Sequence, residues 1–241
     1  MRAFISLVSM LALAACNMAA DANKGETGGG RSGERSYDVG GFEGVTLAGA
    51  QNVVVTVGGA PSVRAEGDAE LLDRTEVKVE NGRLWLGTKK GSNWSLGGGR
   101  QPVTIYVTTP RLTSASILGA GDMRIDKIDG GRFEGSIAGA GDLEVAALRV
   151  DEADLSIAGS GNIRAAGTAA RAKVTIAGAG DVDVTGLETR DAQIAIMGSG
   201  NIRAKATQTA DISVMGVGDV DVTGGARCTI KKGGPGEVRC G

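Results

Sequence analysis

Residues 135–145 read GSIAGAGDLEV, and the same pattern returns at residues 155–165, 174–184 and 194–204 as LSIAGSGNIRA, VTIAGAGDVDV and IAIMGSGNIRA. Each segment has a Gly-x-Gly tripeptide followed by Asp or Asn, and apolar residues occupy alternate positions on both sides of it. Alternation with a period of two is typical of strands, because successive side chains of a strand point to opposite faces. Each segment therefore predicts two short strands joined by a tight glycine turn.

The turn motif is an internal repeat that spans the C-terminal half of the chain. It begins at seven glycines spaced by 20, 20, 19, 20, 18 and 18 residues: Gly119, Gly139, Gly159, Gly178, Gly198, Gly216 and Gly234. A weaker copy begins at Gly49, with Gln51 in place of the second glycine. A short repeat of constant length is typical of solenoids, in which successive coils stack at the strand spacing. We therefore predict an all-β fold, a single-stranded, right-handed parallel β-helix (β-solenoid) of about 20 residues per coil.

One outward position of the repeat carries charges of alternating sign. We call the residues five positions after each first glycine the charge ladder: Arg124, Glu144, Arg164, Asp183, Arg203, Asp221 and Arg239. In a solenoid they would form one vertical column in which every charge lies between two opposite charges. Exposed pairs of this kind contribute only about 0.2–1 kcal/mol each. Their larger expected effect is on register, because a slip by one coil would stack like charges.

A second column follows each glycine turn directly and is rich in Asp and Asn. We call it the turn ladder: Asp122, Asp142, Asn162, Asp181, Asn201, Asp219 and Glu237. Asx side chains at turns hydrogen-bond the local backbone, and the alternation with Asn limits repulsion between the acids. We expect the neighbouring glycines to supply positive φ angles.

The two ends of the stack depart from the repeat. We predict a first coil at residues 42–57 and interpret the irregular stretch from Pro61 to Pro110 as wider N-terminal coils of the same domain. It contains a hairpin over residues 77–86, signalled by its Asn-Gly turn, and a strand at residues 103–108. At the other end Lys232, Pro235 and a disulfide between Cys228 and Cys240 are expected to cap the last coil against further stacking.

The first residues of the chain indicate export. An uncharged, largely apolar run covers residues 3–15, a length typical of a signal-peptide core. Leu13-Ala14-Ala15-Cys16 resembles the bacterial lipobox, so we predict a signal peptide at residues 1–15, lipidation of Cys16 and a flexible Gly-rich tether over residues 16–37. An ordinary signal peptide with an incidental cysteine is the alternative. With Cys16 assigned to lipid, the other two cysteines form an even pair, as expected in an oxidising compartment.

Composition excludes several functions. The chain has no histidine, which excludes Ser-His and Cys-His catalytic couples and most zinc sites. A net charge of -2 gives no basic footprint for nucleic acid. The calcium-binding nonapeptide repeat is absent, and we predict no metal and no cofactor.

Several non-repetitive segments, together with the Gly-x-Gly-Asp/Asn turns, carry a family resemblance. AEGDAELL at residues 65–72, NGRLWL at residues 81–86 and VTIYVTTP at residues 103–110 resemble the GIN-domain family, described as heads of autotransporter adhesins. The resemblance covers about residues 38–241, the predicted solenoid domain. It implies an envelope β-helix protein, often a lipoprotein, whose activity is not established. Asn17 is not the Asp that retains many lipoproteins at the inner membrane, so we expect sorting to the outer membrane, facing the periplasm or the outside.

The sequence supports two functional hypotheses. The first is a non-catalytic cell-envelope lipoprotein that presents a rigid β-helix for adhesion or for interaction with a glycan or an envelope protein. The second is a periplasmic β-helix protein that binds or cleaves polysaccharide, using the acids of the turn ladder beside Arg124 or Arg164. The coils between Gly119 and Gly224 are short and leave no long loops to wall a cleft, so we predict no catalytic residues.

Two surfaces are candidates for contact with a partner. One is the loop around Trp94, where an aromatic ring lies among Gly and Ser; this ring either packs back on the first coils or is an exposed anchor for a ligand. The other is a flat, outward column of small polar residues, formed by Ser116, Ser136, Ser156, Thr175 and Ser213. Such a column is also typical of an ordinary solvent-exposed face of a sheet, with no binding role.

Overall fold

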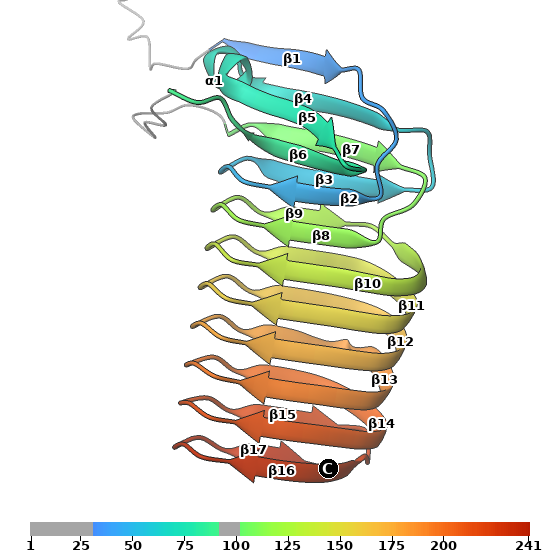
Figure 1. The fold of residues 1–241 in the computed structure, drawn as a ribbon, viewed down its shortest axis with the longest axis vertical. Coiled ribbons are helices and arrows are strands. Elements are labelled where there is room, and N and C mark those ends of the chain that lie inside the picture. Colours follow the sequence, from blue (N-terminus) through green and yellow to red (C-terminus); the bar gives the residue numbers. More distant parts are fainter. Residues whose placement is uncertain (1–30, 92–101) are drawn as a thin grey trace, which may run out of the picture.

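The computed structural model of the chain describes residues 31–91 and 102–241. It is nearly all β and forms a β-solenoid of about six turns, with roughly 20 residues per turn (Figure 1). In chain order its elements are β1 (Ser32–Tyr37), β2 (Gly44–Leu47), β3 (Asn52–Val57), β4 (Ser62–Asp68), α1 (Ala69–Arg74), β5 (Thr75–Glu80), β6 (Arg83–Thr88), β7 (Thr104–Thr109), β8 (Ser114–Ile117), β9 (Met123–Ile125), β10 (Ile128–Ile137), β11 (Leu143–Ile157), β12 (Ile163–Ile176), β13 (Val182–Ile196), β14 (Ile202–Val214), β15 (Val220–Thr223), β16 (Arg227–Lys232) and β17 (Val238–Cys240).

The solenoid has two walls that meet at two different edges. At one, which we call the turn edge, the Gly-x-Gly motifs reverse the chain (Figure 1). At the other, the bend edge, the long strands β11 to β14 bend and continue from one wall into the other. Successive long strands pair in parallel from β10 to β14. The predicted parallel β-solenoid is therefore confirmed.

The interior is a stack of small aliphatic layers. The residues two positions before each turn glycine are at most 1% exposed: Ile117, Ile137, Ile157, Ile176, Ile196 and Val214. They face the column after the turn, which is equally buried over Met123, Leu143, Ile163, Val182, Ile202 and Val220. Burial of one such side chain stabilises the fold by about 1.5–3 kcal/mol, so each coil contributes a similar increment.

Differences in coil length are absorbed at the bend edge. Between β11 and β12 the pairing changes from an offset of 20 residues at Val145 to 19 at Leu148. Gly167 lies at this irregularity with a φ of 127°, and a Cβ there would lie 2.0 Å from the carbonyl oxygen of Leu148. The glycine turns therefore keep their geometry while the opposite edge accommodates coils of 18 to 20 residues.

At the N-terminal end, the order of the coils in space differs from their order along the chain. The coil formed by β2 and β3 lies between the coil of β6 and β7 on one side and the coil of β8 and β9 on the other. The β5–β6 hairpin is present as predicted, with Asn81 and Gly82 both at positive φ. The expectation of wider coils from Pro61 to Pro110 is only partly right, because β4 and β5 pair antiparallel to their neighbours and α1 joins them. These elements close the end of the stack, where strand edges would otherwise be open.

The tether ends earlier than predicted. Ser32–Tyr37, expected to be flexible, forms β1 and pairs antiparallel with β4 over its whole length. Strand β1 pairs with the outer edge of β4, and Arg35 forms an ion pair with Asp73 of α1. The pairing of this edge is the physical reason for order where composition indicated flexibility.

The first turn differs from the others in having Gln51 in place of the second glycine. The side chain of Gln51 is fully buried, although the other repeats have glycine at this position, and its Nε2 donates to the carbonyl oxygen of Gly87 at 3.0 Å. The amide thus links the first turn to the coil above it. Gly121, in the next turn, packs directly against the backbone of Gln51. A Cβ at Gly121 would lie only 1.9 Å from the carbonyl oxygen of Gln51.

Candidate interaction surface

The turn edge is held together by close backbone stacking. A Cβ on Gly139 would lie 1.8 Å from the carbonyl oxygen of Gly119, and Ala140 N donates to that oxygen at 3.0 Å. The expectation that these glycines supply positive φ is wrong: among the glycines of the seven Gly-x-Gly turns only Gly236 has a positive φ. They are glycines because the coils approach too closely for any side chain.

The turn ladder is a continuous hydrogen-bonded column. The side-chain oxygen of each residue from Asp122 to Asp219 accepts a hydrogen bond from the backbone N–H of the equivalent residue in the next coil, at 2.7–3.2 Å. Asn162 and Asn201 also donate from Nδ2 to the acid of the preceding coil, each at 2.9 Å. The bonds therefore run between coils and not within one turn. These carboxylates have a structural role in joining the coils.

The charge ladder forms one column in the strand register. Its seven residues are direct neighbours from Arg124 to Arg239. Within it, Arg124 Nε lies 3.2 Å from Glu144 Oε2, and Arg203 Nη1 lies 3.9 Å from Asp183 Oδ2. Partial burial raises the pKa of Asp183, but hydrogen bonds from Thr185 and the charges of Arg203 and Arg164 outweigh it, so the pKa is lowered. The column thus favours the ionised form of Asp183.

Two further charged columns lie near the bend edge and were missed by the sequence analysis. The first, which we call the Arg132 ladder, consists of Arg132, Glu152, Arg171, Asp191, Thr209 and Arg227. The second consists of Asp129, Arg149, Thr168, Glu188 and Lys205. The Arg132 ladder follows the same spacings of 20, 19, 20, 18 and 18 as the turn glycines, so applying that interval to every position would have found it.

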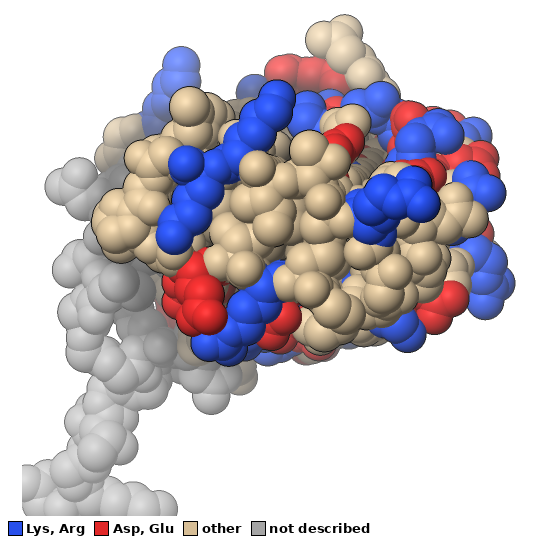
Figure 2. All heavy atoms as spheres, turned by 90° about the horizontal axis from the view of Figure 1, so that it is seen from below, with Lys and Arg blue, Asp and Glu red and all other residues tan. Residues whose placement is uncertain are grey.

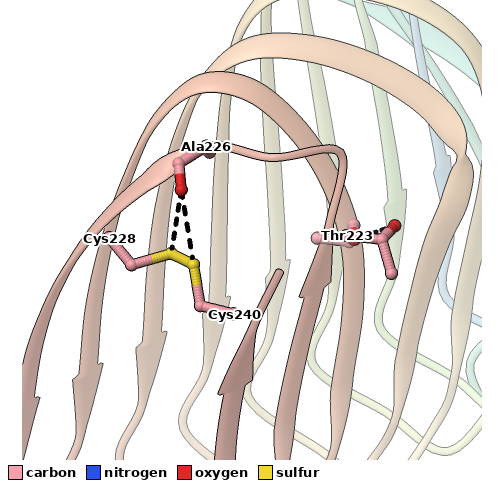
Figure 3. The surroundings of a disulfide bond; sticks show 5 residues. Thr223, Ala226, Cys228 and Cys240 are labelled. Carbon is pink, nitrogen blue, oxygen red and sulfur yellow. Dashed lines mark hydrogen bonds between the residues drawn. A yellow bond between two sulfur atoms is a disulfide. The ribbon is translucent and has the colours of Figure 1, made fainter.

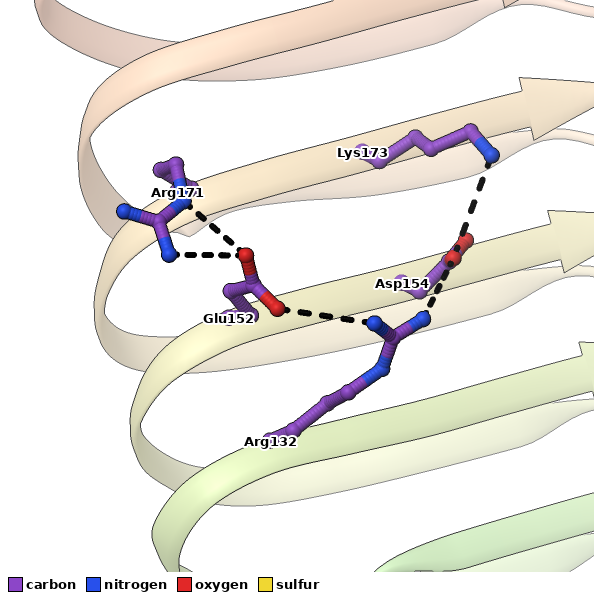
Figure 4. A network of polar contacts seen from close by, with 5 residues as sticks. All are labelled: Arg132, Glu152, Asp154, Arg171 and Lys173. Carbon is purple, nitrogen blue, oxygen red and sulfur yellow. Dashed lines mark hydrogen bonds and ion pairs between the residues drawn. The ribbon is translucent and has the colours of Figure 1, made fainter.

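The Arg132 ladder forms a network of ion pairs (Figure 4). Glu152 accepts from Arg171 at 2.7 Å and lies 3.5 Å from Arg132, which also reaches Asp154 at 3.3 Å. Lys173 lies 3.9 Å from Asp154 on its other side. The hydrogen bond and charge of Arg171 lower the pKa of Glu152. All five side chains line one shallow, open groove of about 350 Å³ on the outside of the wall.

Charge in this groove is balanced. Three cations and three acids line it, together with Gln193 and the small residues Ala153 and Ala172. Guanidinium, carboxylate and amide groups can bind the hydroxyl groups of a sugar or the polar side chains of a protein. Its chemistry is therefore that of a polar contact surface.

The small-polar column lies on the same wall, nearer the turn edge. Ser116, Ser136, Ser156 and Thr175 are neighbours in register and half-buried, and Ser136 Oγ donates to Ser116 Oγ at 3.0 Å. Large apolar side chains are exposed at the turn edge itself: Leu118, Met197, Met215 and Val217. The turn edge therefore combines exposed apolar side chains with the polar turn ladder, whereas the walls carry the charged columns.

The C-terminal coil contains the predicted disulfide between Cys228 and Cys240 (Figure 3). It links β16 on one wall to β17 on the other, so it closes the last coil. Both sulfur atoms lie near the carbonyl oxygen of Ala226, at 3.9 and 3.6 Å. The predicted lipid anchor Cys16 and candidate contact Trp94 lie outside the described residues.

Two features are absent from residues 31–91 and 102–241. No group of three or more Cys, Asp or Glu side chains there is arranged to hold a metal ion. No helix in these ranges is long and apolar enough to cross a membrane.

Most of the solenoid matches one known protein family. Residues 41–226 match the family model described as "Putative auto-transporter adhesin, head GIN domain". The chain belongs to the GIN domain family. Membership indicates an exported, envelope-associated protein with an adhesion-type role. The search of curated proteins found no match to this GIN domain chain.

Solved structures share the fold of this GIN domain. A "putative adhesin" from Bacteroides fragilis is 22% identical with a TM-score of 0.81, covering 87% of this chain and 96% of its own. A "putative lipid binding protein" from Parabacteroides distasonis is 22% identical, with a TM-score of 0.67 and coverage of 87% and 98%. A "putative adhesin" from Parabacteroides merdae is 15% identical, with a TM-score of 0.66 and coverage of 88% and 98%. At these identities the likeness establishes the fold alone.

Proposed function

We propose that this GIN domain protein is a non-catalytic binding head, anchored in the bacterial envelope, that contacts a glycan or an envelope protein through the wall bearing the Arg132 ladder. The groove of about 350 Å³ lined by this ladder is the observation that supports the proposal most directly. Its charged groups are held in fixed positions by ion pairs between coils. A partner therefore meets a surface that needs little ordering on binding.

The contacts of the carboxylates favour binding over catalysis. Asp142 and Asp181, the acids considered for polysaccharide cleavage, each accept two hydrogen bonds from the coil that follows. In the groove, Glu152 lies between two arginines that lower its pKa, whereas a general acid requires a raised pKa. These arrangements support a structural role for the turn ladder and a contact role for the groove.

Binding can be tested with the chain after the predicted signal peptide, carrying Cys16→Ser so that it stays in solution. Glycan arrays and pull-downs from envelope extracts would be compared for this protein and its double variant Arg171→Ala/Lys173→Ala. We expect a bound partner whose capture falls about tenfold or more in the double variant. Arg203→Ala, on the other wall, is the matched control. Unchanged capture by the double variant would show that the groove is not the binding surface.

The anchor is proposed to be a lipid on Cys16, followed by a short tether that ends where β1 begins at Ser32. The lipobox-like residues Leu13 to Cys16 support this proposal, and Asn17 supports sorting to the outer membrane. Metabolic labelling with a fatty acid should mark the wild type and leave Cys16→Ser unlabelled. Protease shaving of intact cells would distinguish the outside from the periplasm. Continued labelling of the variant would contradict the anchor.

A second candidate function is the cleavage of an envelope polysaccharide in the same groove. The observation that favours it is the proximity of carboxylates to cations, with Glu152 beside Arg171 and Asp154 between Arg132 and Lys173. Turnover of a polysaccharide that is lost in Glu152→Gln or Asp154→Asn would establish it. Turnover lost instead in Asp142→Asn or Asp181→Asn would place the reaction on the turn ladder.

A further inference from the structure

The last coil leaves two strand edges without a partner strand among the described residues. Strand β16 pairs with β14, and β17 pairs with β15, each along one edge only. The interior of the solenoid is also open here. Ile230 is 46% exposed, whereas Ile212, its neighbour in the same inward column, is 2% exposed. Open edges with an uncovered apolar column are a template for a further strand.

This end of the molecule is basic. Residues 226–241 contain four cations and one acid, although the whole chain has a net charge of -2. Figure 2 views this end and shows uncharged atoms in the middle, with both Lys or Arg and Asp or Glu side chains around them. Arg239 pairs with Glu237, but Arg227, Lys231 and Lys232 form no ion pair with any residue in the described ranges.

Two outward-facing columns end on cations at this edge. The Arg132 ladder ends on Arg227, and the small-polar column ends on Lys231. Charged neighbours in the ladders above have opposite signs, so one acid in the next layer would pair with Arg227 and a second acid would pair with Lys231. An apolar residue between two such acids would lie over Ile230. The end therefore matches an extended segment with alternating acidic and apolar residues.

A second copy of the chain fits this edge poorly. Antiparallel pairing of β16 with itself about Thr229 would place the outward Arg227 opposite the outward Lys231 of the other copy, and like charges directly opposite are destabilising. A flexible polyanion would satisfy the cations but would leave Ile230 and the edge amides uncovered. The charges, the open backbone and the exposed apolar column together favour a peptide strand.

We propose that β16 is an acceptor strand for an acidic, extended segment of a partner protein, which adds to the open edge. Acids of the segment pair with Arg227 and Lys231, and an apolar residue covers Ile230. This site is separate from the groove on the wall, so its failure leaves the proposed function intact.

The probe is a fluorescent peptide, acetyl-Ser-Glu-Val-Thr-Val-Glu-Val-Ser-amide, and its control has the same composition with the valines grouped at one end. We expect the alternating peptide to bind the whole chain after the predicted signal peptide, carrying Cys16→Ser. It should slow hydrogen exchange of β16 amides while exchange in β11 to β13 stays unchanged. The double variant Arg227→Glu/Lys231→Glu should bind it about tenfold more weakly than the protein without these two substitutions. A peptide with Lys in place of Glu should instead bind the double variant more tightly. Arg149→Glu, an exposed charge on another column, is the control variant.

Three results would overturn the proposal. One is binding that does not depend on Arg227 and Lys231, with the variant's circular dichroism unchanged. Another is equal affinity for the grouped peptide or for polyphosphate, which would indicate a general anion surface. The third is concentration-dependent dimerisation that protects β16 without any peptide, which would make a second copy the occupant.

Discussion

Asn162 donates two hydrogen bonds to a single oxygen of Asp142, one from its backbone nitrogen and one from Nδ2, both 2.9 Å long. The side chain of one coil thereby satisfies the backbone of the next at the turn, where strand pairing stops. We expect Asp142→Ala to lower the free energy of unfolding by about 1–3 kcal/mol, because a part-buried N–H loses its acceptor. Urea denaturation followed by circular dichroism measures this change.

The matched control is Asp142→Asn, which keeps an oxygen at the same place. It should change the free energy of unfolding by no more than about 0.5 kcal/mol. A loss in Asp142→Ala as small as the loss in Asp142→Asn would show that the turn ladder does not hold the coils together.

The stacking of the turn glycines gives a second prediction. A Cβ on Gly139 would meet the carbonyl oxygen of Gly119 at 1.8 Å, and the neighbouring backbone has no side chain that could move aside. Gly139→Ala should therefore separate two coils and lower the free energy of unfolding by about 3 kcal/mol or more. Thermal denaturation is the simplest measurement.

Gly131→Ala is the control for backbone entropy. Gly131 lies in β10 without a positive φ, and the nearest atom to a Cβ there, Asp151 Oδ2, would be 3.9 Å away. This variant should be neutral or slightly stabilising. Equal destabilisation by both substitutions would indicate that close approach at the turn is not what selects glycine.

The repeat made most of the fold predictable. The spacing of the turn glycines gives the coil length, and the alternating signs of Arg124, Glu144 and Arg164 give the register that the structure shows. The disulfide could be predicted because Cys228 and Cys240 fall on opposite walls of one coil. In each case one short interval, repeated many times, determines which residues become neighbours.

The remaining features depend on contacts that the interval does not describe. The pairing of β1 with β4 is antiparallel and joins residues with no repeat between them. The φ angles of the turn glycines are ordinary, because the requirement for glycine comes from the neighbouring coil and not from the turn itself. The Arg132 ladder is different, because it does follow the interval; it lies seven residues before each turn glycine, outside the positions considered with the glycine motif.

The disulfide should stabilise only the end of the stack. Cys228 and Cys240 are 12 residues apart, and closing a loop of this size contributes about 2–4 kcal/mol. In a solenoid each coil contacts only its neighbours, so the effect should remain local. The double variant Cys228→Ser/Cys240→Ser should show faster hydrogen exchange in β16 and β17 and unchanged exchange in β11 to β13. Uniformly faster exchange would mean that the whole solenoid unfolds as one unit.

The ion pairs of Glu152 predict a specific dependence on pH. A hydrogen bond from Arg171 and the charges of Arg171 and Arg132 hold the pKa of Glu152 below its usual value of 4.5. Since the folded state binds this proton less readily than the unfolded state, the stabilisation is fully present above the unfolded pKa. It is lost as the pH falls through the lowered folded pKa.

The melting temperature of the wild type should therefore exceed that of Glu152→Gln at pH 7, and the gap should close as the pH falls below 4.5 towards 3. High salt should also reduce the gap, because the pair is exposed and screened. The control is Glu43→Gln, since Glu43 is exposed and forms no ion pair with any described residue. Its difference from the wild type should be smaller than that of Glu152→Gln at pH 7. A gap for Glu152→Gln that persists unchanged to pH 3 would mean that the carboxylate's charge, and with it the Arg132 ladder, does not contribute to stability.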